Sequence, residues 1–253
     1  MKIEGSRVLL TGGVRGIGHH LLQRLLEAGT EVAVLDKDDD GCRALMAPMQ
    51  DAGRPLHALA CDLGDALAVD AAFAQLQALG FEADALINNA GIIHSEPLVN
   101  RLSRADRVHS RLTWREVMAA DLDSVFFVSS RVVDGWLKRR HKGVVVSISS
   151  IAAAGNAGQS AYSAAKAAVN ALTMTWAKEL GPMGLRFVAV APGFIDTPST
   201  RAALSEATLT RMRQAVPLRQ LGGLDAVWLA VRHALENDYL SGTVTEVDGG
   251  LVL

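Results

Sequence analysis

The sequence predicts a single α/β domain with a doubly wound parallel sheet of about seven strands and helices on both faces. Short apolar or β-branched runs alternate with longer amphipathic stretches, 49% of the 253 residues are hydrophobic, and no low-complexity linker divides them. Because crossovers between parallel strands are right-handed, this alternation winds helices onto both faces of one sheet. We therefore expect residues 1–253 to form one domain.

The expected elements follow from the hydrophobic period, since short β-branched runs indicate buried strands and amphipathic stretches indicate helices. Strands are expected at Arg7–Leu10, Glu31–Leu35, Leu56–Ala60, Ala85–Ile87, Gly143–Ile148, Leu185–Val190 and Thr243–Val247. Helices are expected at Gly16–Ala28, Asp40–Ala52, Asp65–Leu79, Thr113–Arg140, Ala161–Leu180 and Leu224–Asn237.

Charge and cysteine content argue against several classes of function. The formal net charge of −2 leaves no excess of basic residues for binding nucleic-acid phosphates. No apolar run reaches the roughly 18 residues that span a membrane, and the first residues show no signal-peptide pattern. Cys42 and Cys61 have no CxxC or metal-ligand spacing. We expect a cytoplasmic protein with reduced thiols, no metal, and no nucleic-acid or membrane partner.

A glycine-rich turn follows the first strand and precedes a helix: Thr11-Gly12-Gly13-Val14-Arg15-Gly16-Ile17-Gly18. Glycines permit a tight turn and close backbone approach, while the free N–H groups and dipole of a helix start attract a pyrophosphate. The order strand, turn and helix indicates a Rossmann-like dinucleotide site. Its candidate binding residues are Gly12, Arg15, Gly16, Ile17 and Gly18.

Asp36 stands at the end of the second strand, 18 residues after Gly18. An acid there can bind the adenosine ribose hydroxyls and repel a 2′-phosphate, which favours NAD. Arg15 argues the other way, since a guanidinium in the turn could meet that phosphate, so NADP stays an alternative. The acidic run that starts at Asp36 and ends at Asp40 is better explained by helix capping and the helix dipole than by a cation site.

The glycine turn, Asn88-Asn89-Ala90-Gly91 and Tyr162-Ser163-Ala164-Ala165-Lys166 together resemble the short-chain dehydrogenase/reductase family. Further matching segments extend the resemblance over essentially the whole chain. They are Asp62-Leu63, Ser149-Ser150, Pro192-Gly193-Phe194-Ile195-Asp196-Thr197, Ser241-Gly242 and Asp248-Gly249-Gly250.

The resemblance implies an NAD(P)-dependent oxidoreductase and a role for each matching position. Asp62 and Leu63 would lie beside the adenine, Asn89, Ala90 and Gly91 beside the adenosine, and Ile195 and Thr197 beside the nicotinamide amide. Pro192 and Gly193 would complete the cofactor site, together with Tyr162 and Lys166. Similar proteins are homotetramers or homodimers packed through their long helices, here Thr113–Arg140 and Ala161–Leu180.

Tyr162 and Lys166 are four residues apart, so on a helix they share one face. A nearby ammonium favours the anion of a phenol, which lets a tyrosine act as a base. We hypothesise that Tyr162 removes the hydroxyl proton of a secondary alcohol while hydride passes to the nicotinamide, with the roles reversed in ketone reduction. Lys166 would also bind the nicotinamide ribose, as in similar enzymes.

A serine hydroxyl would hold the substrate oxygen, and two serines compete for this role. Counting 13 residues back from Tyr162, the usual family spacing, selects Ser149, whereas aligning the end of the strand selects Ser150. Adjacent strand residues face opposite sides, so only one of them can reach the substrate. We prefer Ser150, with one residue missing from the loop that follows.

The sequence departs from the family where the long central helix usually carries an asparagine that supports a water beside the catalytic lysine. Asp121 stands there instead. A carboxylate can accept from the same water, so a proton relay survives. Its charge would stabilise the Lys166 ammonium, weaken the pull on Tyr162, and shift the activity optimum to higher pH.

Two segments are expected to form substrate loops, 92–112 and 197–217. The first is longer than usual in the family and carries Arg101, Arg104, Arg107 and Arg111. Four arginines could recognise an acidic substrate, but a solvated, partly helical excursion is favoured over that interpretation. The second segment lies where the family has a mobile lid. A catalytically weak nucleotide sensor or structural subunit with the same fold remains the rival function, supported by Asp121.

Overall fold

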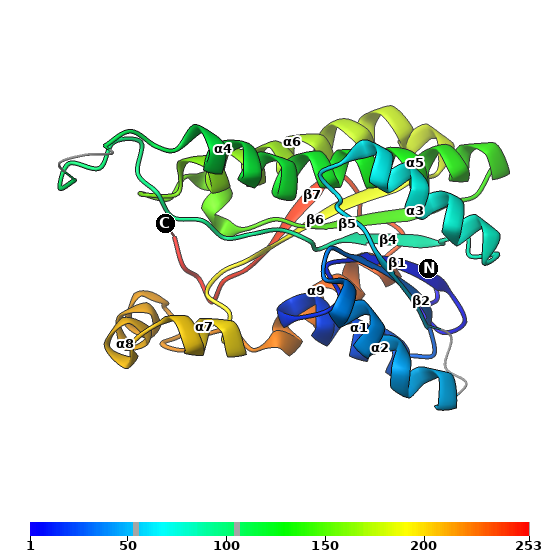
Figure 1. Cartoon of the computed structure of the whole chain (residues 1–253), viewed down its shortest axis with the longest axis horizontal. Helices are drawn as coiled ribbons and strands as arrows, with labels where there is room; N and C mark the ends of the chain where they lie inside the picture. Colours follow the sequence, from blue (N-terminus) through cyan, green and yellow to red (C-terminus); the bar gives the residue numbers. More distant parts are fainter. Residues whose placement is uncertain (53–55, 104–106, 253) are drawn as a thin grey trace.

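All seven strands of the computed structural model lie in one parallel sheet, in the order β3-β2-β1-β4-β5-β6-β7 (Figure 1). The structure describes residues 1–52, 56–103 and 107–252. The strands are β1 (Arg7–Thr11), β2 (Glu31–Asp36), β3 (Leu56–Ala60), β4 (Ala85–Asn88), β5 (Val144–Ile148), β6 (Arg186–Pro192) and β7 (Thr243–Val247). The doubly wound fold predicted from the alternation of elements is confirmed.

Helices cover both faces of the sheet (Figure 1). One layer contains α1 (Gly16–Glu27), α2 (Asp39–Ala52) and α9 (Leu224–Glu236). The opposite layer contains α3 (Ala66–Ala78), α4 (Arg111–Met118), α5 (Ser124–Arg139) and α6 (Ser160–Leu180). The predicted bounds of the first three helices and the last two agree within one residue at each end.

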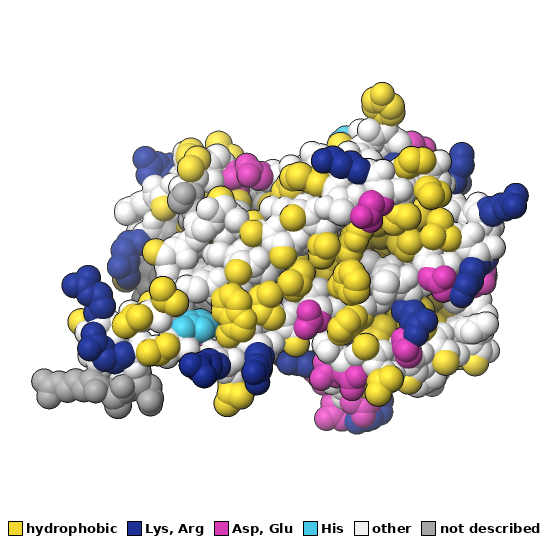
Figure 2. Space-filling view, turned by 90° about the horizontal axis from the view of Figure 1, so that it is seen from above, with side chains coloured by type: hydrophobic (Ala, Val, Ile, Leu, Met, Phe, Trp, Pro, Cys, Tyr) yellow, Lys and Arg dark blue, Asp and Glu magenta, His cyan; other side chains and the backbone are white. Residues whose placement is uncertain are grey.

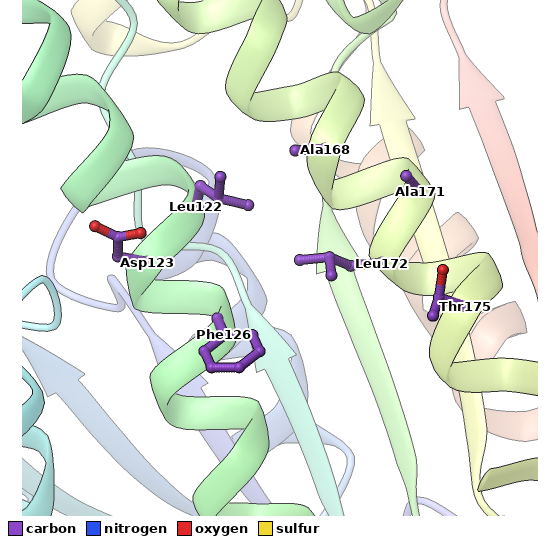
Figure 3. Close-up of a pocket in the computed structure, with 7 residues that line it drawn as sticks. All are labelled: Leu122, Asp123, Phe126, Ala168, Ala171, Leu172 and Thr175. Atoms are coloured by element: carbon purple, nitrogen blue, oxygen red, sulfur yellow. The ribbon is translucent and has the colours of Figure 1, made fainter. Parts of the chain in front are cut away.

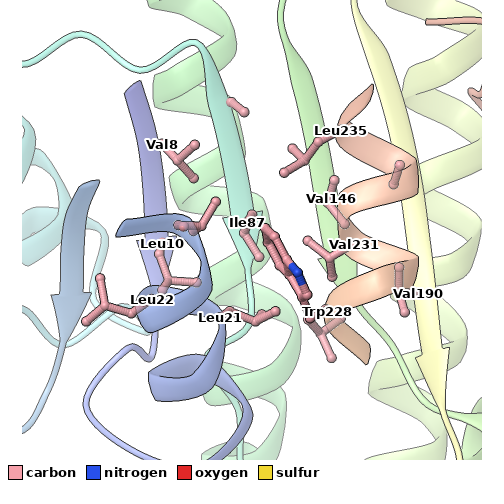
Figure 4. Packing of buried hydrophobic residues seen from close by; sticks show 14 of the residues in the cluster. Val8, Leu10, Leu21, Leu22, Ile87, Val146, Val190, Trp228, Val231 and Leu235 are labelled. Atoms are coloured by element: carbon pink, nitrogen blue, oxygen red, sulfur yellow. The ribbon is translucent and has the colours of Figure 1, made fainter. Parts of the chain in front are cut away.

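The core forms two apolar layers because successive strand residues point to opposite faces of the sheet. Val8, Leu10 and Ile87 face α1 and α9, whereas Leu9, Leu86 and Phe187 face α3, α5 and α6. Figure 4 shows the first layer, in which Trp228, Val231 and Leu235 of α9 meet Leu21 and Leu22 of α1 over the strands. Burial on both faces explains why the inner strands β2, β1, β4, β5 and β6 are nearly continuous apolar runs rather than alternating ones.

The strand order reverses direction at β1, which pairs with β2 on one side and β4 on the other. The connections leaving the carboxyl ends of β1 and β4 therefore run to opposite faces of the sheet. In open α/β sheets such a reversal leaves a crevice at the carboxyl ends of the strands, where ligands bind. The glycine-rich turn and the segment after Asn88 border this crevice.

The helix predicted over 113–140 is not continuous. It begins earlier, at Arg111, and is interrupted by one wide turn, η1 (Ala119–Asp123), which has the i→i+5 hydrogen bonds of a π-helix. Such turns are frequent at functional sites, and this one contains Asp121. The hydrophobic period does not reveal the interruption, because both halves keep an apolar face.

The second predicted substrate loop, 197–217, is largely helical, which corrects the prediction. It contains α7 (Pro198–Ala203) and α8 (Glu206–Ala215). Thr197 accepts a hydrogen bond from Thr200 N–H, and Ser205 accepts one from Thr208 N–H, so each helix begins at a capping side chain. Thr197 followed by Pro198 is a start signal that the sequence analysis did not use.

The first predicted substrate loop, 92–112, is not partly helical among its described residues except where α4 begins at Arg111. Instead, Val99 and Val108 form an isolated antiparallel bridge, with Asn100 N–H donating to the Arg107 carbonyl. The segment extends from the end of the molecule beside α4 (Figure 1). Arg101 and Arg107 are exposed on it, and Arg104 lies outside the described residues.

Candidate active site

The glycine-rich turn joins the carboxyl end of β1 to the start of α1. Arg15 precedes the helix without forming a side-chain cap, and the first turn contains no acidic residue. The first N–H groups of α1, from Gly16 and Ile17 onward, are therefore available to an anion. A Cβ at Gly18 would overlap the Gly12 carbonyl oxygen, so the close packing of the turn requires glycine there. These features fit a bound pyrophosphate.

Thr11 holds the two strand ends of the crevice together. Its hydroxyl oxygen accepts hydrogen bonds from the Asn89 and Ala90 N–H groups, each at 3.0 Å. The Asn89 side chain donates in return to the Gly12 carbonyl at 2.8 Å. Asn89, Ala90 and Gly91 thus lie beside the turn, as the sequence implied. The role of Thr11 itself was missed, although a hydroxyl residue at the end of a buried strand was a usable signal.

Asp36 is the last residue of β2, and its carboxylate binds the backbone of the turn. One oxygen accepts from Val14 N–H and the other from Asp38 N–H, both at 3.1 Å. Asp62 and Leu63 follow β3 next to it, since Cys61 N–H donates to the Asp36 carbonyl at 2.8 Å. Asp62 is exposed and Leu63 is buried. This side of the crevice therefore offers carboxylates and an apolar floor, as an adenosine site requires.

The remaining acidic residues after β2 serve the start of α2, as the sequence predicted. Asp38 accepts a hydrogen bond from Gly41 N–H at 2.9 Å, while Asp39 and Asp40 both pair with Arg43. Cys42 and Cys61 are free and buried beside this acidic segment, and burial together with nearby aspartates raises the pKa of each thiol to about 11. Both are therefore protonated and unreactive at neutral pH.

Tyr162 and Lys166 share the buried face of α6, with exposed fractions of 8% and 4%. The Lys166 ammonium lies 5.7 Å from the centre of the Tyr162 ring. It donates to the Ile148 carbonyl at the end of β5, at 3.1 Å, and lies 3.0 Å from Asp121 Oδ1. The expected proximity of the two side chains is present, and the ammonium is anchored from two further elements.

Asp121 is fully buried in the π-turn and contacts Lys166 directly. Its Oδ2 accepts from Ile92 N–H at 3.3 Å. Burial raises the pKa of Asp121, and the nearby Lys166 ammonium partly offsets that effect. Oδ1 lies within ion-pair distance of Lys166 but receives no well-directed hydrogen bond from the described residues. A Cβ at Gly91 would overlap this oxygen, so the absence of a side chain at position 91 leaves room for the Asp121 carboxylate.

The two candidate serines differ in their surroundings. The Ser149 hydroxyl is buried, 3% exposed as a residue, and donates to the Lys166 backbone carbonyl at 3.3 Å. Ser150 is partly exposed and precedes a short 3-10 helix, η2 (Ile151–Ala154), where its hydroxyl oxygen accepts from Ala152 N–H at 3.1 Å. Only Ser150 keeps its hydroxyl proton and part of its surface for another partner.

The segment between β6 and α7 borders the same end of the sheet. Pro192 ends β6, and Gly193 N–H donates to the Val247 carbonyl at 2.9 Å, which fixes the turn against β7. Ile195 is buried, and Thr197 caps α7. These four residues, predicted to bind the cofactor, with Ile195 and Thr197 beside its nicotinamide, thus lie on one continuous stretch at the end of a single strand.

Comparison with known proteins agrees with this geometry. The model of the family described as short chain dehydrogenase matches residues 6–208. The chain is 30% identical over 255 aligned residues to the 3-oxoacyl-acyl-carrier-protein reductase of Escherichia coli, with all of both chains covered. Among solved structures, a gluconate 5-dehydrogenase from Burkholderia cenocepacia in complex with NADP and tartrate superposes with a TM-score of 0.88. It is 28% identical, and the match covers 99% of this chain and 97% of that one.

A 4-hydroxyisoleucine dehydrogenase complexed with NADH has a TM-score of 0.86 and 25% identity, over 97% of this chain and 98% of that one. The relatives thus include one structure with NADP and one with NADH. The chain belongs to the short-chain dehydrogenase family, whose members are NAD(P)-dependent oxidoreductases that act on alcohol or ketone groups.

Proposed function

We propose that residues 1–253 act as one domain that interconverts a secondary alcohol and its ketone, with Tyr162 as the general acid and base. The observation that carries this proposal is the buried cluster of Tyr162, Lys166 and Asp121, with Ser150 at the end of the adjacent strand. When bound, a nicotinamide cofactor supplies the acceptor or donor of the hydride.

In the oxidation direction, the Ser150 hydroxyl donates a hydrogen bond to the substrate oxygen and orients it. The Tyr162 phenolate removes the hydroxyl proton as the carbinol carbon loses its hydride. The Lys166 ammonium, fixed by the Ile148 carbonyl, stabilises that phenolate. In the reduction direction, the Tyr162 hydroxyl returns the proton to the forming alkoxide. Ser149 has no part in these steps, because its hydroxyl is already bonded to the Lys166 carbonyl.

Asp121 acts on Tyr162 through Lys166. A carboxylate 3.0 Å from the Lys166 ammonium holds that side chain in place in a buried site. The same negative charge opposes the effect of the ammonium on the phenol. We therefore propose that Asp121 gives the enzyme an activity optimum at higher pH than an asparagine at this position would.

NAD is the proposed cofactor, in preference to NADP. Asp36 is fixed by Val14 N–H beside the turn, with Asp38 next to it, so a 2′-phosphate would meet negative charge. The Arg43 guanidinium nearby is already paired with Asp39 and Asp40. The Arg15 side chain is exposed and is the one group of the turn that favours NADP.

The proposal is tested by titrating the protein with NADH and NADPH, and then following reduced-nicotinamide absorbance over a panel of ketones and alcohols. The panel includes sugar acids, hydroxy amino acids and 3-oxoacyl thioesters. Tighter binding of NADH and turnover on part of the panel are expected. Tight binding of NADH without turnover on any substrate would instead support the nucleotide-sensor function.

We also propose a homodimer or homotetramer packed through α5 and α6. An open hollow of about 380 Å³ lies between these helices, lined by Leu122, Asp123, Phe126, Ala168, Ala171, Leu172 and Thr175 (Figure 3). It lies on the face of α6 opposite Tyr162, so it is not the substrate site. Phe126 and Met174 are 48% and 42% exposed, and hydrophobic side chains gather over this layer (Figure 2). Such a patch is typical of an interface between subunits.

Sedimentation velocity at several protein concentrations tests the oligomer. Phe126→Glu should shift the protein toward monomer, whereas Leu67→Glu, at an exposed position of α3, should not. No helix among the described residues is long and apolar enough to cross a membrane. With two free thiols, a cytoplasmic location is proposed.

A further inference from the structure

One carboxylate, that of Glu96, closes the base of the long segment between β4 and α4. Glu96 Oε1 accepts a hydrogen bond from Ser110 N–H at 2.8 Å. Its Oε2 lies 3.2 Å from His94 Nε2 and 3.6 Å from His109 Nδ1. We call this group the Glu96 clasp; it consists of Glu96, His94, His109 and Ser110. The Glu96 side chain thereby contacts residues at both ends of the segment between β4 and α4.

The clasp is joined to the start of α4. Ser110 caps this helix, since its hydroxyl oxygen accepts from Thr113 N–H at 3.2 Å. Helix α4 continues directly into the π-turn that contains Asp121. Asp121 in turn accepts from Ile92 N–H, near the beginning of the same segment. Two side-chain carboxylates therefore tie the stretch from Ile92 to Asp121 together, that of Glu96 and the buried one beside Lys166.

The clasp is also joined to the start of α6. The backbone of Glu96 forms a parallel bridge with Gln159, and the Gln159 side chain donates to the Ser95 hydroxyl at 3.2 Å. Ser163 N–H donates to the Gln159 carbonyl at 2.8 Å in the first turn of α6. Tyr162 lies in that same turn. Glu96 thus contacts the leading ends of both helical stretches that carry the proposed proton-transfer groups.

We propose that Glu96 is a positioning residue for proton transfer, which sets Tyr162 and Asp121 relative to each other by holding the starts of α6 and α4 together. This inference rests on the proposed function, because it concerns where the proton-transfer groups stand. Catalysis by positioned groups is sensitive to small displacements, and a misplacement of about 1 Å can cost on the order of 100-fold in rate. Glu96 need not touch substrate or cofactor for this role.

The charge of Glu96 matters as well as its shape. The hydrogen bond from Ser110 N–H and the two histidines hold the pKa of Glu96 below its ordinary value, so it is anionic at neutral pH. Among the described residues, the titratable side chains that act on it are His94 and His109. Gln159, which immediately precedes α6, pairs with the Glu96 backbone, and Trp114 packs against His109 from α4. Protonation of either imidazole strengthens its attraction to the carboxylate.

The first test compares Glu96→Ala and Glu96→Gln with Glu116→Ala, which removes an exposed carboxylate from α4. Glu96→Ala should lower kcat by about 10- to 100-fold while the Kd for NADH stays unchanged, and Glu116→Ala should behave as wild type. Glutamine keeps an acceptor for Ser110 N–H but has no charge. Glu96→Gln should therefore have a kcat between those of Glu96→Ala and wild type, and its deficit relative to wild type should grow as the pH is lowered, because a protonated imidazole attracts a carboxylate more strongly than an amide.

A wild-type kcat in Glu96→Ala would overturn the inference. If that variant does not fold, Glu96→Gln decides: a ratio to wild type that is constant with pH shows that the charge is not used and overturns it as well.

The second test does not depend on turnover. Hydrogen–deuterium exchange of the cofactor-free protein should show faster exchange at Ser110 to Thr113 and at Gln159 to Ser163 in Glu96→Ala, and no change at β1 or α1. If Glu96→Ala shows this faster exchange but the wild-type protein turns over no substrate, the proposed function is contradicted and the structural link from Glu96 to α4 and α6 is retained. Faster exchange at residues 110–113 alone would show that Glu96 does not reach α6, and would overturn the inference.

Discussion

The two halves of the crevice are built in different ways. The nucleotide half, formed by β1, β2 and β4, depends on backbone groups: the free N–H groups of α1, the Gly12 carbonyl that accepts from the Asn89 side chain, and the Val14 N–H that donates to Asp36. The reaction half depends on side chains from separate elements, namely Ser150 after β5, Tyr162 and Lys166 on α6, and Asp121 in the π-turn. Backbone sites follow from local sequence, whereas side-chain sites require distant segments to meet.

Replacing the general base should separate the two halves most clearly. Tyr162→Phe removes the proton acceptor but keeps the ring, so turnover should fall by about 10²- to 10⁴-fold. The Kd for NADH should stay the same, because the turn and Asp36 are untouched. The fully exposed Tyr239 offers the matched control, and Tyr239→Phe should retain full activity. Equal activity in both variants would remove Tyr162 from the mechanism.

The converse experiment damages the nucleotide half. Gly18→Ala places a Cβ against the Gly12 carbonyl, and such overpacking costs about 1–3 kcal/mol, which, taken from the binding free energy, corresponds to NADH binding about 5- to 150-fold weaker. Isothermal titration measures the Kd. Gly135→Ala adds the same methyl group to α5 where no atom lies within 4 Å, and should leave NADH binding unchanged. Equal losses of NADH affinity in both variants would show that the loss does not come from the glycine-rich turn.

Asp36 tests which dinucleotide the nucleotide half selects. Asp36→Asn removes a charge that would face a 2′-phosphate, and at a few Å in a half-solvated site this is worth on the order of 1 kcal/mol or more. The ratio of NADPH to NADH affinity should therefore rise about tenfold, measured by competitive titration. Asp39→Asn, at a carboxylate already paired with Arg43, should change that ratio little. A ratio that does not respond to Asp36 contradicts the assignment of NAD.

Asp121 connects charge to rate within the reaction half. Asp121→Asn removes the negative charge that opposes Lys166, so the phenolate of Tyr162 should form more readily. The rise of kcat with pH in the oxidation direction should then move to lower pH, as recorded over a series of buffers of constant ionic strength. Asp123→Asn, a partly exposed neighbour, serves as the control. An unmoved profile would show that Asp121 does not act on the base.

The same residue predicts a smaller effect on stability. Burial raises the pKa of Asp121 above the unfolded value of 3.8, so between these two values the native state binds more protons than the unfolded state. The free energy of unfolding therefore decreases as pH rises through that window, by about 1.4 kcal/mol for each unit of pKa difference. Urea denaturation at several pH values should show a shallower decrease in Asp121→Asn than in wild type.

Much of the fold could be predicted from sequence because its signals are local. Five of the seven strands, β1, β2, β4, β5 and β6, are runs of mostly buried β-branched or apolar residues, and the glycine turn lies within eight consecutive positions. Tyr162 and Lys166 were also predictable, since a spacing of four places two side chains on one helical face. Their mutual distance is fixed by one helix and depends on no other part of the chain.

The rest depends on contacts between distant segments. The pairing of Asp121 with Lys166 spans 45 positions, and that of Glu96 with the start of α6 spans 63, so no window of sequence contains either. The choice between Ser149 and Ser150 depends on which hydroxyl donates to the Lys166 carbonyl, a contact between separate segments of the chain. The helices α7 and α8 were missed for another reason. They are short and polar, so the hydrophobic period does not indicate them, and only their capping residues mark where they begin.

The π-turn at 119–123 makes the number of residues between α4 and α5 a functional property of the chain. An α-helix advances by about 100° per residue, so an extra residue in one turn rotates everything before it relative to everything after it. This rotation lets α4 serve the Glu96 clasp while α5 packs on the sheet. Loss of one residue from this turn would restore a regular helix and swing Asp121 away from Lys166. Insertions in the segment between β4 and α4 would leave the angle between α4 and α5 unchanged. That segment can therefore vary in length, whereas the π-turn between α4 and α5 cannot.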